Sequence, residues 1–233
     1  QGYTAMKWDP FYKAENVIDS VTMRRVVEQV KALRDAVGWD VDLLIEGHGR
    51  FNPYTALQIA NELAPYKPYF FEEPTLPENF EACAHVRARS PIPIASGERW
   101  CTKSDFRAAL EAGAIDIAQP DLRICGGITE GKKIAALCEA NQVPLAPHNI
   151  HGQIGTAASL HLACAIPNAI ILEYSVDDKM LKESLFDHLY KPVDGYMYIN
   201  DRPGLGIDFN EEVALAHPFR NISMVQTLYP MEF

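Results

Sequence analysis

Residues 42–50 read DLLIEGHGR, and in this stretch the apolar run Leu43-Leu44-Ile45 ends on two polar residues, Glu46 and His48. A short apolar run without polar alternation is typical of a strand buried on both faces, as strands of a parallel sheet are. Similar runs return along the chain. Seven stretches are therefore expected as strands: 4–9, 42–47, 69–74, 93–97, 116–121, 143–148 and 169–175.

Amphipathic segments lie between the expected strands. Helices are expected at 21–36, 54–63, 79–89, 103–112, 128–141 and 154–165, and several follow Ser, Thr, Asn or Pro, which favour helix starts. Strict alternation implies a parallel sheet with helical crossovers, either an open doubly wound sheet or a closed barrel. The glycine pattern of dinucleotide-binding open sheets is missing, because Gly126-Gly127 follows the fifth strand and lacks the required spacing. The fold class predicted is α/β, with a (β/α)-barrel.

The length of the chain bounds its domain organisation. An eight-stranded barrel occupies about 250 residues, whereas this chain has 233 residues and opens almost directly on a strand. We expect the first βα unit to be missing, so that residues 1–190 form a barrel domain from its second strand onward. Residues 191–233 carry turn signals such as Pro203 and Gly204, and are expected to form a C-terminal tail that packs against the barrel.

Composition excludes several classes of partner. The net charge of −10 argues against a nucleic-acid partner, because proteins that bind phosphate backbones display clustered Lys and Arg. No apolar run reaches the length of a membrane helix and no signal peptide is evident, so we expect a cytoplasmic protein without a membrane partner. The five cysteines are odd in number and widely spread, which predicts reduced thiols.

Each expected strand ends on chemically useful side chains, and from Glu46 onward these follow one another at about 25 residues, which is the length of one βα unit. In chain order these residues are Lys7, Asp9, Glu46, His48, Glu72, Glu98, Asp121, His148 and Glu173. Barrel enzymes carry their chemistry at the carboxyl ends of the strands. We therefore expect these residues to converge around one mouth.

Three of these residues, Glu46, Glu72 and Glu98, are carboxylates on consecutive strands. Their charges would repel and raise one another's pKa values unless a cation neutralised them. Oxygen ligands without cysteine suit a hard ion, so we predict that they bind Mg²⁺. Such an ion, bound to a substrate carboxylate, would stabilise the enediolate that forms when the alpha proton is removed.

Two histidines are candidates for proton transfer. His148 has a possible orienting carboxylate in Asp121 on the preceding strand, which would raise its proton affinity. His48 lies two residues beyond Glu46, so it is expected to share the mouth with that ligand, across the barrel from His148. Histidines on opposite sides of a substrate suit proton abstraction on one face and protonation of a departing hydroxyl on the other.

Several motifs together carry a resemblance to a known family. They are 44–50 (LIEGHGR), 70–74 (FFEEP), 97–99 (GER), 119–122 (QPDL), 126–129 (GGIT), 146–148 (APH), 172–173 (LE) and 203–206 (PGLG). In their order and spacing they resemble the enolase superfamily, in its mandelate racemase subgroup, and within it the sugar-acid dehydratases. The resemblance covers nearly all of the chain. It implies a barrel that works under an N-terminal capping domain, which is not found in this sequence, and a homo-oligomeric assembly.

The resemblance also implies roles for single residues. Glu46, Glu72 and Glu98 match the metal ligands, Asp121 and His148 the His–Asp dyad, His48 the acid, and Glu173 a carboxylate near the substrate. Lys7, Asp9 and Arg50 are predicted to bind substrate as well. Lys7 is open to a purely structural ion pair, and Arg50 to pairing with a neighbouring acid such as Glu72 or Glu73. His151 is interpreted as a loop residue, and contact with substrate is the alternative interpretation.

Two positions depart from the family pattern. Galactonate dehydratases usually begin the metal motif with Asp where this chain has Glu46, and racemases carry Lys-x-Lys where this chain reads Lys7-Trp8-Asp9. The resemblance thus favours a Mg²⁺-dependent dehydratase of an aldonate such as galactonate, giving a 2-keto-3-deoxy acid. The alternatives are an epimerase or cycloisomerase acting through the same enediolate, and a catalytically silent barrel that binds sugar acids.

Overall fold

A single parallel sheet organises the chain in the computed structural model, which describes residues 2–150, 152–176 and 184–217. Its order is β1-β2-β3-β4-β5, so every strand pairs with the next one along the chain. The strands are β1 (Ala5–Trp8), β2 (Asp42–Glu46), β3 (Phe70–Glu72), β4 (Ile94–Ser96) and β5 (Ile117–Ala118). All four pairings are parallel. Five of the predicted strands are therefore present, each shorter than its sequence pattern.

The sixth and seventh predicted strands are reduced to single parallel bridges. Leu145 bridges Ala118 on one side and Ala169 on the other, which continues the sheet order by two positions. Leu145 lies between Pro144 and Pro147, and proline has no N–H to donate to a sheet ladder. Extended ladders therefore cannot form here, although the chain keeps the path that the pattern predicts.

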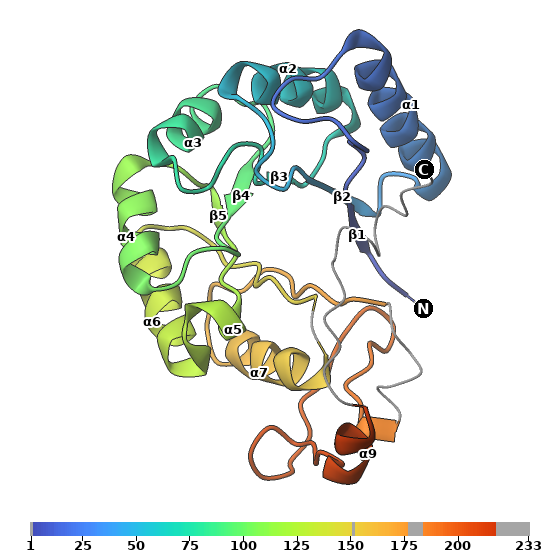
Figure 1. Cartoon of the computed structure of the whole chain (residues 1–233), viewed down its shortest axis with the longest axis vertical. Coiled ribbons are helices and arrows are strands. Elements are labelled where there is room, and N and C mark those ends of the chain that lie inside the picture. Colours follow the sequence, from blue (N-terminus) through green and yellow to red (C-terminus); the bar gives the residue numbers. More distant parts are fainter. Residues whose placement is uncertain (1, 151, 177–183, 218–233) are drawn as a thin grey trace.

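Helices surround the strands on the outside (Figure 1). They are α1 (Ser20–Val37), α2 (Pro53–Leu63) with the short η1 (Ala64–Tyr66), α3 (Phe80–Arg87), α4 (Lys103–Ala112), α6 (Gly127–Ala140) and α7 (Gln153–Cys164). Side-chain caps explain several starts: Asp19 and Asn52 accept backbone N–H groups at the starts of α1 and α2, and Thr102 forms a capping box at α4. Two short helices, α5 (Leu122–Cys125) and α9 (Glu211–Ala216), were not predicted.

Burial on both faces of the strands defines the architecture. Leu44 and Phe70 belong to one buried cluster with Ala95, Ile117 and Ala146. Their sequence neighbours Ile45 and Phe71 belong to a different cluster, which includes residues of α1 and α2. Successive residues of a strand point to opposite faces, so one face lines the interior and the other packs under helices. The fold class is confirmed as a partial (β/α)-barrel.

The first part of the C-terminal tail packs on α7. Tyr190 is buried against Ala157 and Leu160, and Leu205 and Ile207 pack against the same cluster. The Tyr190 hydroxyl donates to the backbone oxygen of Leu205 at 3.0 Å. The tail therefore contacts the barrel as far as it is described, whereas a domain boundary at residue 190 stays a prediction and residues 218–233 lie outside the described residues.

Two further expectations concern the chain as a whole. All five cysteines are free thiols, as predicted, with Cys83, Cys125 and Cys138 buried and Cys101 and Cys164 exposed. Among the helices of the described ranges, none is long and apolar enough to cross a membrane.

Candidate active site

The three predicted metal ligands come together at the carboxyl ends of neighbouring strands. Glu46 and Glu72 are the last residues of β2 and β3 and pair directly in register, while Glu98 follows β4. One carboxylate oxygen from each of the three lies within 4.8 Å of the others. Glu46 and Glu72 are buried and Glu98 is half-buried. The ends of the strands therefore collect three carboxyl groups in a space largely shielded from water.

The pKa values show how costly this arrangement is. Burial raises the pKa of Glu46 well above its usual range, and the neighbouring charge of Glu72 raises it further. Burial also opposes ionisation of Glu72, but Lys7 together with hydrogen bonds to Glu46 and Gln119 outweighs it and lowers the pKa of Glu72 to about 2. Glu98 has a raised pKa as well, chiefly from burial. A further positive charge is therefore needed before all three groups can ionise together.

Lys7 on β1 supplies positive charge to the site. Its Nζ lies 2.9 and 2.8 Å from the two carboxylate oxygens of Glu72, 2.8 Å from Glu173 and 3.6 Å from Glu46. Burial would lower the pKa of Lys7, but these three carboxylates raise it overall, so the ammonium group keeps its charge. The single positive charge of Lys7 cannot balance the ionised forms of these three carboxyl groups and of Glu98, so the site lacks positive charge.

The donor set fits a hard divalent cation. All three converging groups are carboxylates, and carboxylate oxygen is the ligand that Mg²⁺ and Ca²⁺ prefer. The raised pKa of Glu46 favours its protonated form, and a carboxyl group must lose its proton to bind a metal ion. A cation that binds here is therefore expected to replace a proton. Gln119 holds one ligand in place, because its Nε2 donates to Glu72 at 2.7 Å. Sequence reasoning missed Gln119, although its place directly after β5 and two residues before Asp121 was a usable signal.

His148 and Asp121 form a hydrogen-bonded pair beside these carboxylates. Nδ1 of His148 lies 2.9 Å from Oδ2 of Asp121, and Oδ1 of Asp121 accepts the backbone N–H of Arg123 at 2.8 Å. Nε2 of His148 lies 3.2 Å from Glu98. Burial lowers the pKa of His148, but Asp121, Glu173 and Glu98 raise it overall. The pair has the geometry of a base whose ring orientation is fixed by an acid.

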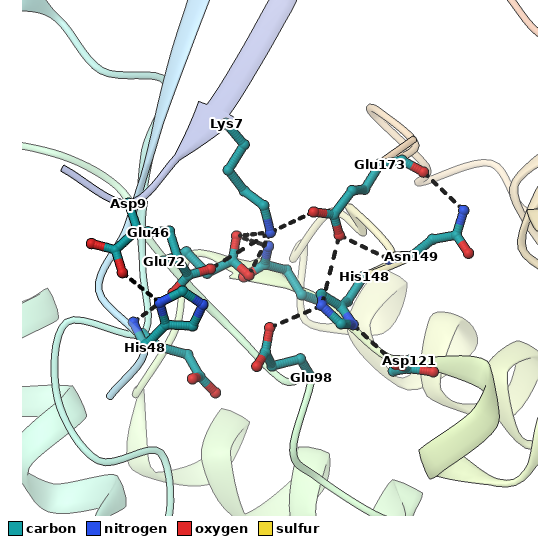
Figure 2. A network of polar contacts seen from close by, with 12 residues as sticks. Lys7, Asp9, Glu46, His48, Glu72, Glu98, Asp121, His148, Asn149 and Glu173 are labelled. Atoms are coloured by element: carbon teal, nitrogen blue, oxygen red, sulfur yellow. Dashed lines mark hydrogen bonds and ion pairs between the residues drawn. The ribbon is translucent and has the colours of Figure 1, made fainter. Parts of the chain in front are cut away.

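Glu173 is fixed by a residue that the sequence did not single out. The backbone N–H of Asn149 donates to Glu173 Oε2 at 2.8 Å, and the Asn149 side chain donates to the Glu173 backbone oxygen at 3.0 Å. Asn149 is buried directly after His148. The other carboxylate oxygen of Glu173 contacts Lys7. Glu173 therefore lies between Lys7 and the side of the site where His148 and Asn149 stand (Figure 2).

His48 lies at the other end of the network. Its Nδ1 is 2.8 Å from Oδ2 of Asp9, and its backbone N–H donates to Glu46 at 2.6 Å. The backbone of His48 has a φ of 52°, and its side chain is half exposed. Gly47 before it is required by packing, because a Cβ there would meet the Glu73 backbone oxygen at 2.6 Å. This close approach of two strand ends sets the turn that carries His48.

Arg50 forms an ion pair with a neighbouring acid, which was one of the two interpretations of this residue. The acid is Asp9, whereas Glu72 and Glu73 were named as examples. Its other guanidinium N–H groups donate to backbone oxygens of Gly47 and Tyr12, which turn the side chain toward the β1 side of the turn. Glu73 pairs instead with Arg99, at 3.1 Å. Asp9 and Arg50, both predicted to bind substrate, thus have protein partners, and His151 lies outside the described residues.

Comparison with known proteins agrees with this geometry. The family model described as "Enolase C-terminal domain-like" matches residues 1–213. D-gluconate dehydratase of Thermoproteus tenax is 39% identical over 214 residues, covering 91% of this chain and 43% of that protein. D-galactonate dehydratase of Pectobacterium atrosepticum is 39% identical over 195 residues, covering 81% of this chain and 51% of that protein.

Solved structures give the same result. The mandelate racemase/muconate lactonizing enzyme from Sulfitobacter sp. aligns with a TM-score of 0.89 and 37% identity, covering 95% of this chain and 57% of the other. The corresponding protein from Jannaschia sp. CCS1 aligns with a TM-score of 0.88 and 37% identity, covering 95% and 58%.

A partial (β/α)-barrel with three clustered carboxyl groups at its strand ends defines the class of enolase-type barrel domains. The chain belongs to the enolase superfamily, in its mandelate racemase subgroup. The family resemblance inferred from the motifs is therefore confirmed. The chain spans about half the length of the curated relatives that it matches.

Proposed function

We propose that the protein is a Mg²⁺-dependent sugar-acid dehydratase that converts an aldonate to a 2-keto-3-deoxy acid. The observation that carries this proposal is the juxtaposition of the three clustered carboxylates with the His148–Asp121 pair, whose ring nitrogen lies 3.2 Å from Glu98. A base beside a cation site suits removal of a proton alpha to a carboxylate. The dehydratase names of the relatives support the choice of reaction.

Glu46, Glu72 and Glu98 would hold Mg²⁺. When bound, the ion would supply positive charge against the substrate carboxylate, which makes the proton on the neighbouring carbon more acidic. Lys7 adds a fixed ammonium group on the same side, within 2.8 Å of Glu72 and Glu173. It is suited to binding a second carboxylate oxygen of the substrate, and Glu173 to accepting a hydrogen bond from a substrate hydroxyl.

His148 is the base of the proposed reaction. Asp121 accepts the Nδ1 hydrogen and leaves Nε2 as the atom that takes the C2 proton of the aldonate. The electron pair of the C–H bond then moves into the carboxylate to give the enediolate. Since burial alone would lower the proton affinity of His148, the contact with Asp121 is needed for the ring to hold the proton.

His48 is the acid. The enediolate electrons form a C2–C3 double bond, the C3–O bond breaks, and the departing hydroxyl takes a proton from His48 to leave as water. The enol that remains moves its hydroxyl proton to solvent and takes one at C3, which gives the 2-keto-3-deoxy acid. The sum of these steps is loss of one water molecule, with both histidines restored by proton exchange.

The substrate is proposed as an aldonate without a fixed stereochemistry. Gluconate and galactonate differ in configuration at one carbon, and dehydratases of both are among the relatives. Glu46, where galactonate dehydratases usually carry Asp, is one methylene longer and would shift the bound ion or narrow the space beside it. A homo-oligomer located in the cytoplasm stays a prediction of the sequence.

The experiment is a screen of the full-length protein, supplied with Mg²⁺, against stereoisomeric aldonates and aldarates, in which a carbonyl reagent detects 2-keto-3-deoxy products. We expect one or a few acids to react. Product without loss of water would favour an epimerase or cycloisomerase. Absence of both product and C2 hydrogen exchange across the panel would favour a binding protein and contradict the proposal.

A further inference from the structure

Two Asp–His pairs in the site have the same local geometry. Oδ1 of Asp121 accepts the backbone N–H of the residue two positions on at 2.8 Å, and its Oδ2 lies 2.9 Å from Nδ1 of His148. Oδ1 of Asp9 accepts the backbone N–H two positions on, that of Phe11, at 2.9 Å, and its Oδ2 lies 2.8 Å from Nδ1 of His48. Each aspartate follows a strand, and each is anchored by its own turn.

Asp9 is held more firmly than a loop carboxylate usually is. Its Oδ2 also receives an N–H from Arg50, which is itself fixed by the backbone oxygens of Gly47 and Tyr12. The Asp9 side chain is four-fifths buried. Its orientation is thus set by β1 on one side and by the turn after β2 on the other.

His48 needs such a partner. Its side chain is half exposed and stands on a left-handed backbone position, so packing alone leaves the ring room to rotate. The bond to Asp9 uses Nδ1, and Figure 2 shows the second ring nitrogen turned away from Asp9 toward the side where His148 lies. A carboxylate on one ring nitrogen fixes both the tautomer and the direction of the other nitrogen.

We propose that Asp9 is a positioning residue for His48, accepting its Nδ1 hydrogen so that Nε2 is the atom that faces the substrate and gives its proton to the departing C3 hydroxyl. Arg50 supports His48 through Asp9. This inference rests on the proposed dehydration, and it replaces the expectation that Asp9 and Arg50 bind substrate. The barrel then carries two like pairs on opposite sides of one substrate, one for each proton transfer.

The test compares the same substitution in the two pairs, Asp9→Asn and Asp121→Asn, in the full-length Mg²⁺-loaded protein. For Asp9→Asn we expect kcat of dehydration to fall roughly 10- to 100-fold, with KM within about twofold because substrate contacts persist. Deuterium should still enter C2 of recovered substrate from D₂O, because His148 is untouched. Asp121→Asn should lose exchange and dehydration together. Equal loss of exchange in both variants, or an unchanged kcat in Asp9→Asn, would overturn the proposal.

A second readout does not depend on turnover. In protein labelled with ¹⁵N-histidine, the neutral ring of His48 is expected as the Nδ1–H tautomer, with a shift toward Nε2–H in Asp9→Asn and a return in Asp9→Glu if the longer acid still reaches. His48→Asn assigns the resonance. If no aldonate is dehydrated by the wild-type protein, the proposed function fails while this measurement still tests the pairing. An Nε2–H tautomer in the wild-type protein would contradict the pairing itself.

A variant that disturbs folding would not answer the question, so Arg50→Gln provides a second route. It leaves the Asp9 carboxylate in place and removes one of its anchors. The expected loss in kcat is smaller than for Asp9→Asn, again with C2 exchange retained. A rise in KM without a fall in kcat would mean that Arg50 binds substrate, as the sequence first suggested, and would count against the proposal.

Discussion

Glu46 and Glu72 sit directly opposite each other at the ends of β2 and β3, and their pKa values move in opposite directions. Glu72 is ionised and bound by Lys7, whereas burial and the charge of Glu72 favour the protonated form of Glu46. The pair therefore holds a proton that a metal ion has to replace. Two predictions about the metal site depend on this relationship.

Binding of Mg²⁺ is expected to release a proton wherever the pH lies below the raised pKa of Glu46. Because the pKa of Glu46 is raised, the proton bound there is lost only when the cation arrives, so affinity for Mg²⁺ should increase as the pH rises toward that pKa. Calorimetric titration in buffers of different ionisation enthalpy measures the number of protons released. Glu46→Gln should bind Mg²⁺ at least about tenfold more weakly and release no proton from this position. Proton-free binding by the wild-type protein would contradict the pairing described here.

Lys7→Met should destabilise the metal-free protein by about 3 kcal/mol, because it leaves the buried charge of Glu72 without its main partner. Saturating Mg²⁺ should recover much of this loss, since the ion supplies positive charge to the same carboxylates. Urea unfolding with and without Mg²⁺ measures both values. Lys31→Met, which removes an exposed ion pair with Asp35, is the control and should change stability by less than about 1 kcal/mol. An equal effect of the two substitutions would show that Lys7 does not stabilise the cluster.

Glu73 gives a prediction about pH and stability. Burial, followed by the nearby charge of Glu98, raises its pKa from the ordinary value of 4.5 to about 8. The folded protein then keeps a proton that the unfolded chain releases, so stability falls as pH rises through this window. In metal-free buffer, Glu73→Gln should reduce the loss of stability with rising pH. It should not abolish this loss, because Glu46 also has a raised pKa. Exposed Glu111→Gln is the control, and an unchanged slope for Glu73→Gln would mean that Glu73 is ionised in the folded protein.

His148→Asn should remove proton abstraction without removing the fold. Asparagine approximates the size of the ring and can still donate to Asp121, but it cannot accept the C2 proton. We expect C2 exchange and dehydration both to fall roughly 10²- to 10⁴-fold. Mg²⁺ affinity should stay close to that of the wild-type protein, and circular dichroism should be unchanged. Retained exchange in a folded His148→Asn variant would assign the base to another residue.

The periodic part of the molecule could be predicted from the sequence, because βα units place their strand-end residues at one mouth whatever the details of each turn. Glu46, Glu72 and Glu98 converge for that reason, as do Asp121 and His148. The lengths of the last strands could not be predicted from apolar runs alone. The prolines beside Leu145 remove ladder donors, which a hydrophobicity pattern does not register.

Contacts made by residues in turns were harder to predict from the sequence. The partner of Arg50 depends on the left-handed backbone at His48 and on the close approach of Gly47 to β3. Neither feature produces a repeating pattern of residues that could be recognised in the sequence. Asn149 and Gln119 act through hydrogen bonds to Glu173 and Glu72, so their roles follow only from the three-dimensional arrangement.

Dehydration through a C2 carbanion is the central claim, and one reaction in D₂O tests it most directly. The full-length Mg²⁺-loaded protein is incubated with the aldonate that reacts fastest in the screen, and product and residual substrate are followed by ¹H NMR and mass spectrometry. The account predicts a 2-keto-3-deoxy acid that carries one solvent deuterium at C3 and has lost its C2 hydrogen. A product that retains all its hydroxyl groups, or substrate whose C2 hydrogen never exchanges and never leaves, would contradict it.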